Sequence, residues 1–194
     1  DTKEMLADCY KYLAFPRYTK GSFADRVEKA WEAFAEHEAE LRQLVDNGAS
    51  GDEIQQLAFY SLKLAFPNLA FEIGSQNYHI TLSANGTWVL YPLFRFFLSR
   101  MPESVRHHWK FSIGRSANPD LSVDFGEGVI SAEDVLVYFT KDEGGESVSV
   151  GVYHPLLLEG DSPAWWRAEV LVDNAVGELV VTEFISVINV LEEA

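Results

Sequence analysis

The hydrophobic pattern changes its period once along the chain, from the spacing of a helix to that of a strand. In the amino-terminal third, large apolar residues recur every three, four or seven positions, as in Val27, Trp31 and Phe34. From about residue 68 onward, apolar residues alternate with polar ones in short runs. A helix repeats about every 3.6 residues and a strand every two. Helices followed by strands predict an α+β fold.

Two pairs of residues mark the beginnings of the expected amino-terminal helices. Ser22 with Asp25 fits the capping pattern before a helix that ends near Asn47-Gly48, and Ser50 with Glu53 fits it again before a second helix. The short connection between them predicts an antiparallel helix pair. Residues 2–14 are expected to form an earlier helix.

The middle of the chain predicts a set of antiparallel strands. Asn85-Gly86 is a preferred two-residue turn between strands. With a similar two-residue turn between the first two strands, Glu72 would lie directly opposite His79. The strands expected here cover 69–73, 78–82 and 87–91.

The remaining sequence adds more strands and a late helix. An apolar helical stretch is expected over 93–101, and Pro163 opens a helix that runs to about Val176. The β-branched run over 179–188 predicts a last strand, with a terminal helix as the alternative. The other expected strands cover 108–113, 121–125, 135–140 and 147–153.

Together these elements predict a single α+β domain over residues 1–194. Its helical part covers 1–67 and residues 68–194 form mainly antiparallel sheet. An amino-terminal helical hairpin packs on this sheet of about six or seven strands, with a late helix. At 194 residues and 47% hydrophobic composition, the chain can bury a substantial core.

Negative charge is concentrated in the second part of the chain. The net charge is −15, and residues 116–194 carry 16 acidic residues against only Lys141 and Arg167. Such a field attracts a basic protein and repels nucleic acid. We therefore expect a basic protein partner and no nucleic acid.

The chain contains no motif for a metal, a cofactor or a nucleophile. His107 and His108 are neighbours on an expected strand, where they would point to opposite faces and could not share one ion. Cys9 lies in an apolar helical setting that would keep its thiol protonated. Glycines in the second half stand among acids that repel a phosphate. We expect no metal, no cofactor and a non-catalytic role, with a small enzyme using Glu72, His79 and His154 as the alternative.

Cysteine content and hydropathy bear on the cellular compartment. Cys9 is the single cysteine, so no intramolecular disulfide can form. No apolar run reaches the roughly 18 residues that cross a bilayer. A cytoplasmic protein without membrane contact is the expectation.

The adjacent Trp165 and Trp166 stand at the start of the late helix among acidic residues. Exposed indoles supply contact area, and carboxylates supply attraction to a basic surface. The residues expected to bind the partner are Asp142, Glu143, Glu146, Asp161, Trp165, Trp166 and Glu169.

Three segments of the chain carry a resemblance to known proteins. They are Trp31-x-x-Phe34-x-x-His37-Glu38-x-x-Leu41, Phe71-Glu72-Ile73-Gly74, and Asp173-Asn174-Ala175-Val176-Gly177-Glu178 before a β-branched run. The arrangement resembles a group of uncharacterised small acidic bacterial proteins in which a helical hairpin precedes an antiparallel sheet. Some proteins of this kind are similar to immunity proteins, which neutralise a toxin by covering its basic active site. The resemblance implies an inhibitor of a basic partner such as a toxin.

Overall fold

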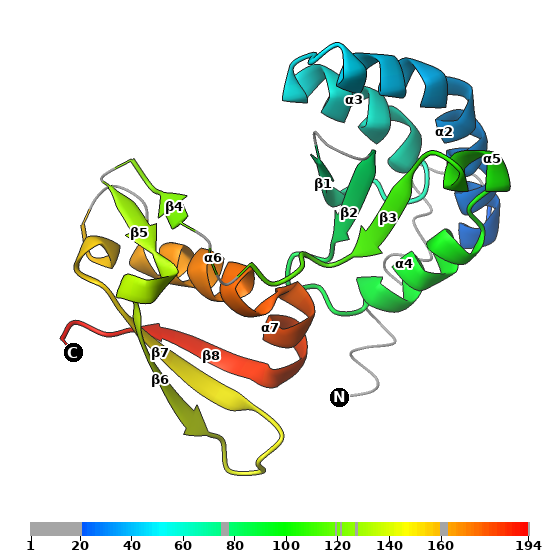
Figure 1. Ribbon diagram of the computed structural model, residues 1–194. Helices are drawn as coiled ribbons and strands as arrows, with labels where there is room; N and C mark the ends of the chain where they lie inside the picture. Colours follow the sequence, from blue (N-terminus) through cyan, green and yellow to red (C-terminus); the bar gives the residue numbers. More distant parts are fainter. Residues whose placement is uncertain are drawn as a thin grey trace. The chain divides into compact units, whose positions relative to one another are not determined.

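The chain forms two compact units in the computed structural model, unit 1 over Asp1–Ile113 and unit 2 over Gly114–Ala194 (Figure 1). The structure describes residues 21–74, 78–118, 120, 122–126, 128–159 and 163–193. The predicted α+β class is confirmed, with helices first, strands afterwards and a late helix. The helix predicted over 2–14 lies outside the described residues. The single domain predicted from the sequence stays a prediction.

The described part of unit 1 begins with the two predicted helices, α2 (Phe23–Asp46) and α3 (Gly51–Leu62). At the start of α2 the Ser22 hydroxyl accepts the Asp25 N–H at 3.2 Å, and the Asp25 carboxylate accepts the Ser22 N–H at 2.7 Å. Ser50 accepts the Glu53 N–H at the start of α3 in the same way. Because these bonds satisfy backbone donors that a helix leaves unpaired, both predicted beginnings are correct.

The first strands, β1 (Ala70–Gly74) and β2 (His79–Ser83), pair antiparallel as predicted. Their register differs from the prediction, because Glu72 lies opposite Thr81 and His79 lies opposite Gly74. The connection runs from Gly74 to His79 and is longer than the two-residue turn assumed, so the predicted opposition of Glu72 and His79 is wrong.

The strand predicted over 87–91 is also wrong. Asn85 and Gly86 do form a turn with positive φ, but the chain then enters α4 (Leu90–Ser99). Leu90, Leu93 and Phe97 of α4 are buried at helical spacing, and this burial overrides the strand preference of the residues before it.

A helical connection brings the third strand of this sheet beside the second. After α4 comes the short α5 (Glu103–Arg106), and β3 (Lys110–Ile113) then pairs parallel to β2. The strand predicted over 108–113 therefore exists from Lys110, and His107 and His108 precede it.

Aromatic packing holds unit 1 together. Trp31 of α2 is buried, stacks on Phe97 of α4 with ring centroids 4.2 Å apart, and donates its indole N–H to the Phe97 carbonyl at 2.9 Å. Phe34 and Trp109 meet edge to face beside this pair. Helices α2 and α4 therefore share one core with the sheet.

Unit 2 contains two further small sheets, so the eight strands of the described chain form three sheets instead of one antiparallel sheet. In unit 2 the β4–β5 sheet is antiparallel. The β6–β7–β8 sheet contains the antiparallel pair β6–β7 and the parallel pair β7–β8. Strand β8 pairs parallel to β7 because α6 and α7 lie between these two strands in the chain and carry it back to the same end of the sheet. The elements in order are β4 (Ser122–Asp124), β5 (Val129–Ser131), η1 (Ala132–Asp134), β6 (Leu136–Lys141), β7 (Val148–Tyr153), η2 (Pro155–Leu157), α6 (Ala164–Val176), α7 (Glu178–Phe184) and β8 (Ile185–Val190).

The segment over 179–188 combines both predicted alternatives. Its first part belongs to α7, and the strand β8 begins only at Ile185. Gly177, with φ of +89°, separates α6 from α7. The core of unit 2 joins Val150 and Val152 of β7 to Leu171 and Val172 of α6.

Replacement of Trp31 tests the aromatic core. Trp31→Ala removes a buried indole and its hydrogen bond, and we expect it to destabilise the fold by about 3–5 kcal/mol. The midpoint of urea unfolding should fall accordingly, while Glu36→Ala at an exposed position of α2 should change stability by less than about 0.5 kcal/mol. Equal midpoints for the two variants would contradict the packing described.

Candidate functional site

The acidic residues of unit 2 lie mainly on its surface. Of those that the structure describes, all are exposed except Asp142, Asp173 and Glu178. The positive charges are placed differently, because Arg167 is buried and Arg115 is partly buried, while Lys141 is exposed. The surface of unit 2 therefore carries a large excess of negative charge.

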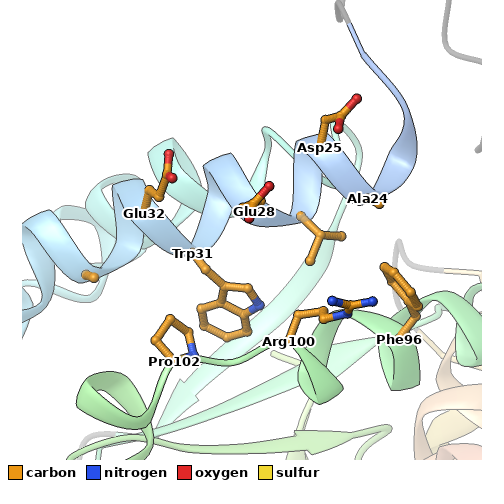
Figure 2. Close-up of a pocket in the computed structure, with 10 residues that line it drawn as sticks. Ala24, Asp25, Glu28, Trp31, Glu32, Phe96, Arg100 and Pro102 are labelled. Carbon is orange, nitrogen blue, oxygen red and sulfur yellow. The ribbon is translucent and has the colours of Figure 1, made fainter.

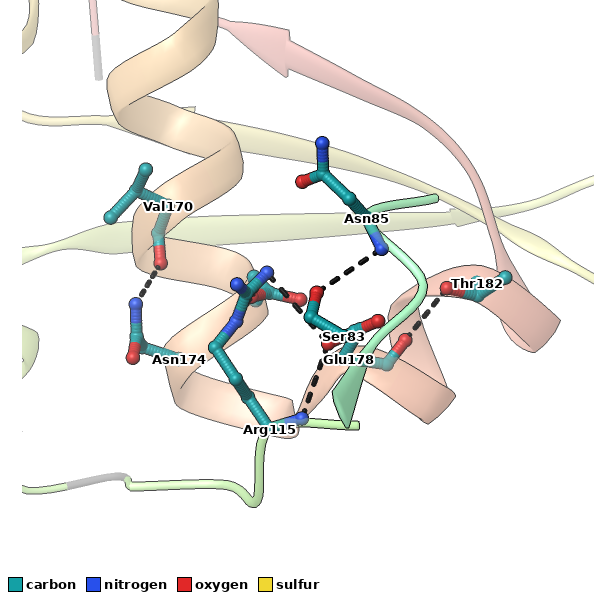
Figure 3. A network of polar contacts seen from close by, with 8 residues as sticks. Ser83, Asn85, Arg115, Val170, Asn174, Glu178 and Thr182 are labelled. Carbon is teal, nitrogen blue, oxygen red and sulfur yellow. Dashed lines mark hydrogen bonds and ion pairs between the residues drawn. The ribbon is translucent and has the colours of Figure 1, made fainter. Parts of the chain in front are cut away.

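Arg115 is held by two carboxylates inside unit 2 (Figure 3). Its guanidinium Nε donates to the Asp173 carboxylate at 2.6 Å, and its Nη2 lies 3.9 Å from Oε2 of Glu178. The Arg115 N–H also donates to Glu178, whose side chain is 2% exposed. These contacts join the segment before β4 to α6 and α7, and they occupy Arg115 within the fold.

Gly177 allows this segment to approach the α6–α7 junction closely. A Cβ atom at this position would lie 3.0 Å from the Ala117 backbone nitrogen and 3.2 Å from the Arg115 carbonyl oxygen. Its φ of +89° is also unfavourable for a residue with a side chain. Glycine is therefore required here by both conformation and space.

Three of the predicted site residues lie in the loop between β6 and β7. Glu143 and Glu146 are exposed in this loop. Asp142 is more enclosed, and its carboxylate accepts hydrogen bonds from the Ser147 hydroxyl at 2.6 Å and the Ser149 hydroxyl at 2.8 Å. The hydroxyls of Ser147, Ser186 and Ser149 hold the pKa of Asp142 below its ordinary value. Asp142 therefore stabilises the hairpin, while the two glutamates face solvent.

The predicted tryptophans lie in the first turn of α6. Trp165 is 57% exposed and Trp166 is 44% exposed, and the Trp166 ring meets Phe125 edge to face with centroids 6.0 Å apart. Glu169 is exposed one turn after Trp165 and Trp166. Asp161 lies outside the described residues.

The two groups of predicted site residues lie at opposite ends of the β6–β7–β8 sheet. The acidic loop precedes Val148, where β7 begins, whereas α6 begins after β7 has ended at Tyr153. The first turn of α6 is tied to the segment after β7, because buried Arg167 donates to the Leu156 carbonyl at 2.8 Å. Six strand residues span about 20 Å. The loop acids and the tryptophans are therefore not brought together.

Strand β6 carries exposed apolar residues that the predicted site does not include, on the same face of the sheet as α6. Val137 lies opposite Val152 of β7, and Phe139 lies opposite Val150. The two residues on β7 are buried, but Val137 is 42% exposed and Phe139 is 68% exposed. The sequence signal for this strand is an uninterrupted apolar run over 135–139, which predicts a strand and does not tell whether it is covered.

A cavity of about 420 Å³ in unit 1 lies between α2 and the end of α4 (Figure 2). Its described lining includes Trp31 and the acids Glu28 and Glu32 on α2, with Phe96 and Arg100 on the other side. The Arg100 guanidinium lies over the Phe96 ring, 5.2 Å from its centroid. Neither Glu72 nor His79 is among the described lining residues.

The residues of the alternative enzyme prediction are divided between the two units. Glu72 and His79 lie on β1 and β2 of unit 1, and the His79 imidazole Nε2 lies 3.0 Å from the Ser112 hydroxyl. His154 belongs to unit 2, where its Nδ1 accepts the Leu156 N–H at 3.2 Å at the start of η2. Glu72 and His79 are therefore diagonal neighbours on a sheet, and His154 caps a short helix.

The described residues lack the features of two further classes of site. They contain no group of three or more histidine, cysteine, aspartate or glutamate side chains placed to hold a metal ion. Among them, no helix has both the length and the apolar composition to cross a membrane.

Comparison of the chain with protein-family models, with curated proteins and with solved structures finds no match.

Three glycine replacements separate conformational strain from steric clash. Gly177→Ala combines a positive φ with backbone contacts, and we expect it to destabilise unit 2 by roughly 2–4 kcal/mol. Gly126→Ala has a similar φ of +96° with open space around it and should cost about 1 kcal/mol. Gly144→Ala has neither feature and should be nearly neutral. Thermal unfolding of the three variants checks this order, and a neutral Gly177→Ala would refute the close approach.

The Asp142 pKa provides a test of the hairpin. Removal of the hydroxyl in Ser147→Ala should raise the pKa of Asp142 toward its ordinary value, as followed by carboxyl NMR signals during a pH titration. Because the folded-state pKa is lowered, the carboxylate stabilises the hairpin above the ordinary pKa, and this contribution is lost as pH falls through the lowered value. Ser122→Ala, on β4, serves as the control. An unchanged Asp142 titration in Ser147→Ala would contradict the hydrogen bond.

Proposed function

We propose that this chain is a non-catalytic protein-binding module whose acidic second unit binds a basic protein. The observation that carries the proposal is the charge balance at the surface of unit 2. Most of its acids are exposed, Arg115 and Arg167 are engaged within the fold, and Lys141 is the exposed strong base. A surface of this kind speeds the encounter with a cationic protein.

The exposed apolar side chains of unit 2 support contact with a protein surface. Phe139, Trp165 and Trp166 are each more than two-fifths exposed. Aromatic side chains contribute strongly to protein interfaces when they become buried there. Charge therefore supplies attraction, and these aromatic groups supply area that binding removes from water.

In its more specific form, the proposal is an inhibitor that covers a basic functional surface, as an immunity protein covers the active site of a toxin. The resemblance inferred from the sequence motifs suggests this form, and the exposed acids of unit 2 are the observation that supports it. Inhibition of this kind requires no catalytic group in the inhibitor, only a surface that competes with the anionic substrate of the basic partner.

A pull-down with charge-reversed variants tests the proposal. The immobilised chain is incubated with lysate of its source cell at about 0.05 M and about 0.5 M salt, and retained proteins are identified by mass spectrometry. We expect a basic protein at low salt that is lost at high salt, and weaker retention by the double variant Glu143→Lys/Glu146→Lys.

The matched control is Glu36→Lys/Glu40→Lys, which changes the net charge equally on an exposed face of α2 in unit 1. This control should retain the partner. Absence of any basic protein at low salt, or equal loss of the partner in both double variants, would contradict binding through unit 2.

A further inference from the structure

Strand β6 occupies an edge of its sheet. In the part of the chain that the structure describes, β6 pairs with β7 alone, and all six of its residues are exposed (Figure 1). Its apolar side chains are substantially exposed, from 42% at Val137 to 68% at Phe139. An edge strand of this kind offers backbone donors and acceptors to another strand.

The hydrogen-bond pattern identifies which backbone groups face outward. The Asp142 N–H donates to the Ser147 carbonyl at 3.1 Å, and the register from this pair to Leu136 opposite Tyr153 contains no bulge. Since inward and outward groups alternate along an antiparallel strand, the N–H and C=O groups of Val137, Phe139 and Lys141 point away from β7. Three alternate residues of β6 therefore each direct a backbone N–H and C=O group outward at this edge.

β6 lacks the features with which sheet edges are commonly protected. It contains no proline, its pairing with β7 is regular, and its one charged residue, Lys141, stands at its end. Natural edge strands are usually shortened, bulged or charged along their length. A long, regular and apolar edge is instead typical of an interaction site.

A hollow on the helix-covered face adjoins this edge. It has a volume of about 70 Å³, and its described lining is almost wholly apolar, including Val135 and Val137 on the β6 side and Leu171 and Val172 on α6. A strand added beside β6 would direct alternate side chains toward this face. The hollow has room for one small apolar side chain.

Acidic residues flank β6 at both ends and indicate which strand can bind. Glu133 and Asp134 precede β6, and Asp142, Glu143 and Glu146 follow it, against the single base Lys141 at the end of the strand. A second copy of β6 would place acids beside acids in either direction of pairing, which is unfavourable. A segment with an apolar centre and lysine or arginine at both ends is complementary in charge and in pattern.

We propose that β6 is a docking edge that binds an extended segment of the basic partner as a fourth strand of the β6–β7–β8 sheet. The segment has small apolar residues at its centre and basic residues at each end. This inference rests on the proposed function and specifies how the partner is held. Backbone hydrogen bonds provide the attachment, the hollow beside Val137 selects a side chain, and the flanking acids fix the position of the segment.

A pair of peptides tests backbone pairing directly. The probe is Lys-Lys-Val-Thr-Val-Thr-Val-Lys-Lys, and its matched control has the same sequence with the five central amides N-methylated. Both peptides carry the same charge, but only the first can pair as a strand. We expect the N-methylated peptide to bind the full chain at least about tenfold more weakly by calorimetry, because several hydrogen bonds are lost.

Two replacements at one position test the strand itself. Phe139→Ala removes the side chain and keeps the outward N–H, whereas Phe139→Pro also removes that N–H, which β7 does not use. We expect Phe139→Pro to bind the unmodified peptide several-fold more weakly than Phe139→Ala. Amide exchange at Tyr138 and Thr140, whose N–H groups face β7, reports whether the hairpin of each variant stays folded.

Each outcome of the two tests bears on the proposal. Equal binding of the two peptides, with the same salt dependence, would overturn strand docking and leave the proposed binding of a basic partner standing. No binding of the unmodified peptide at low salt would overturn the stated chemistry of the segment. A dimer of the chain in light scattering that Phe139→Pro converts to a monomer would assign the edge to a second copy and overturn the proposal as well.

Discussion

The width of helix α6 determines which strand of the β6–β7–β8 sheet remains exposed to solvent. Helix α6 packs its apolar face on the β6–β7–β8 sheet and shares a buried cluster with Val150 and Val152 of β7. A helix is about 10 Å wide and neighbouring strands are about 4.8 Å apart, so one helix covers about two strands. Because α6 lies over β7 and β8, the apolar side chains of β6 on the same face stay in water.

The second feature that shapes unit 2 is the internal use of its positive charges. Arg115 is enclosed by Asp173 and Glu178, and Arg167 is buried with its guanidinium on the Leu156 carbonyl. Ion pairs of this kind fix the position of the segments they join. The ion pairs of Arg115 and the hydrogen bond of Arg167 to a backbone carbonyl leave the exposed carboxylates of unit 2 with little neutralising charge from these two residues. Folding therefore increases the contrast between an internally paired core and a negative surface.

Local signals in the sequence predict the helices well and the strands less well. Ser22 and Ser50 mark real helix starts because capping depends on neighbouring residues alone. The Asn85-Gly86 turn is equally local, but the structure that follows it depends on the burial of Leu93 and Phe97 by distant residues. The register and the parallel pairing of the strands likewise depend on the lengths of the connections between them, which the hydrophobic pattern of the sequence does not specify.

The candidate site likewise combines features that local sequence predicts with features that depend on distant parts of the chain. The exposure of Glu143, Glu146 and the paired tryptophans follows from their local context, and the structure places all of them in water. Their separation along β7 follows from the path of the chain into α6, which no local signal indicates. The exposure of Phe139 follows from the width of the covering helix, so an apolar run alone predicts a strand without predicting its surroundings.

The parallel pairing of β8 with β7 has a consequence for the order of folding. The β6–β7 hairpin closes through a short loop, whereas β8 can join only after α6 and α7 have formed a crossover between the two strands. Short loops close with a smaller entropic cost than long ones. The pairing of β6 with β7 is therefore local in sequence and that of β8 with β7 is not, so in any chain where the hairpin forms first, β7 keeps a second unpaired edge until β8 joins it.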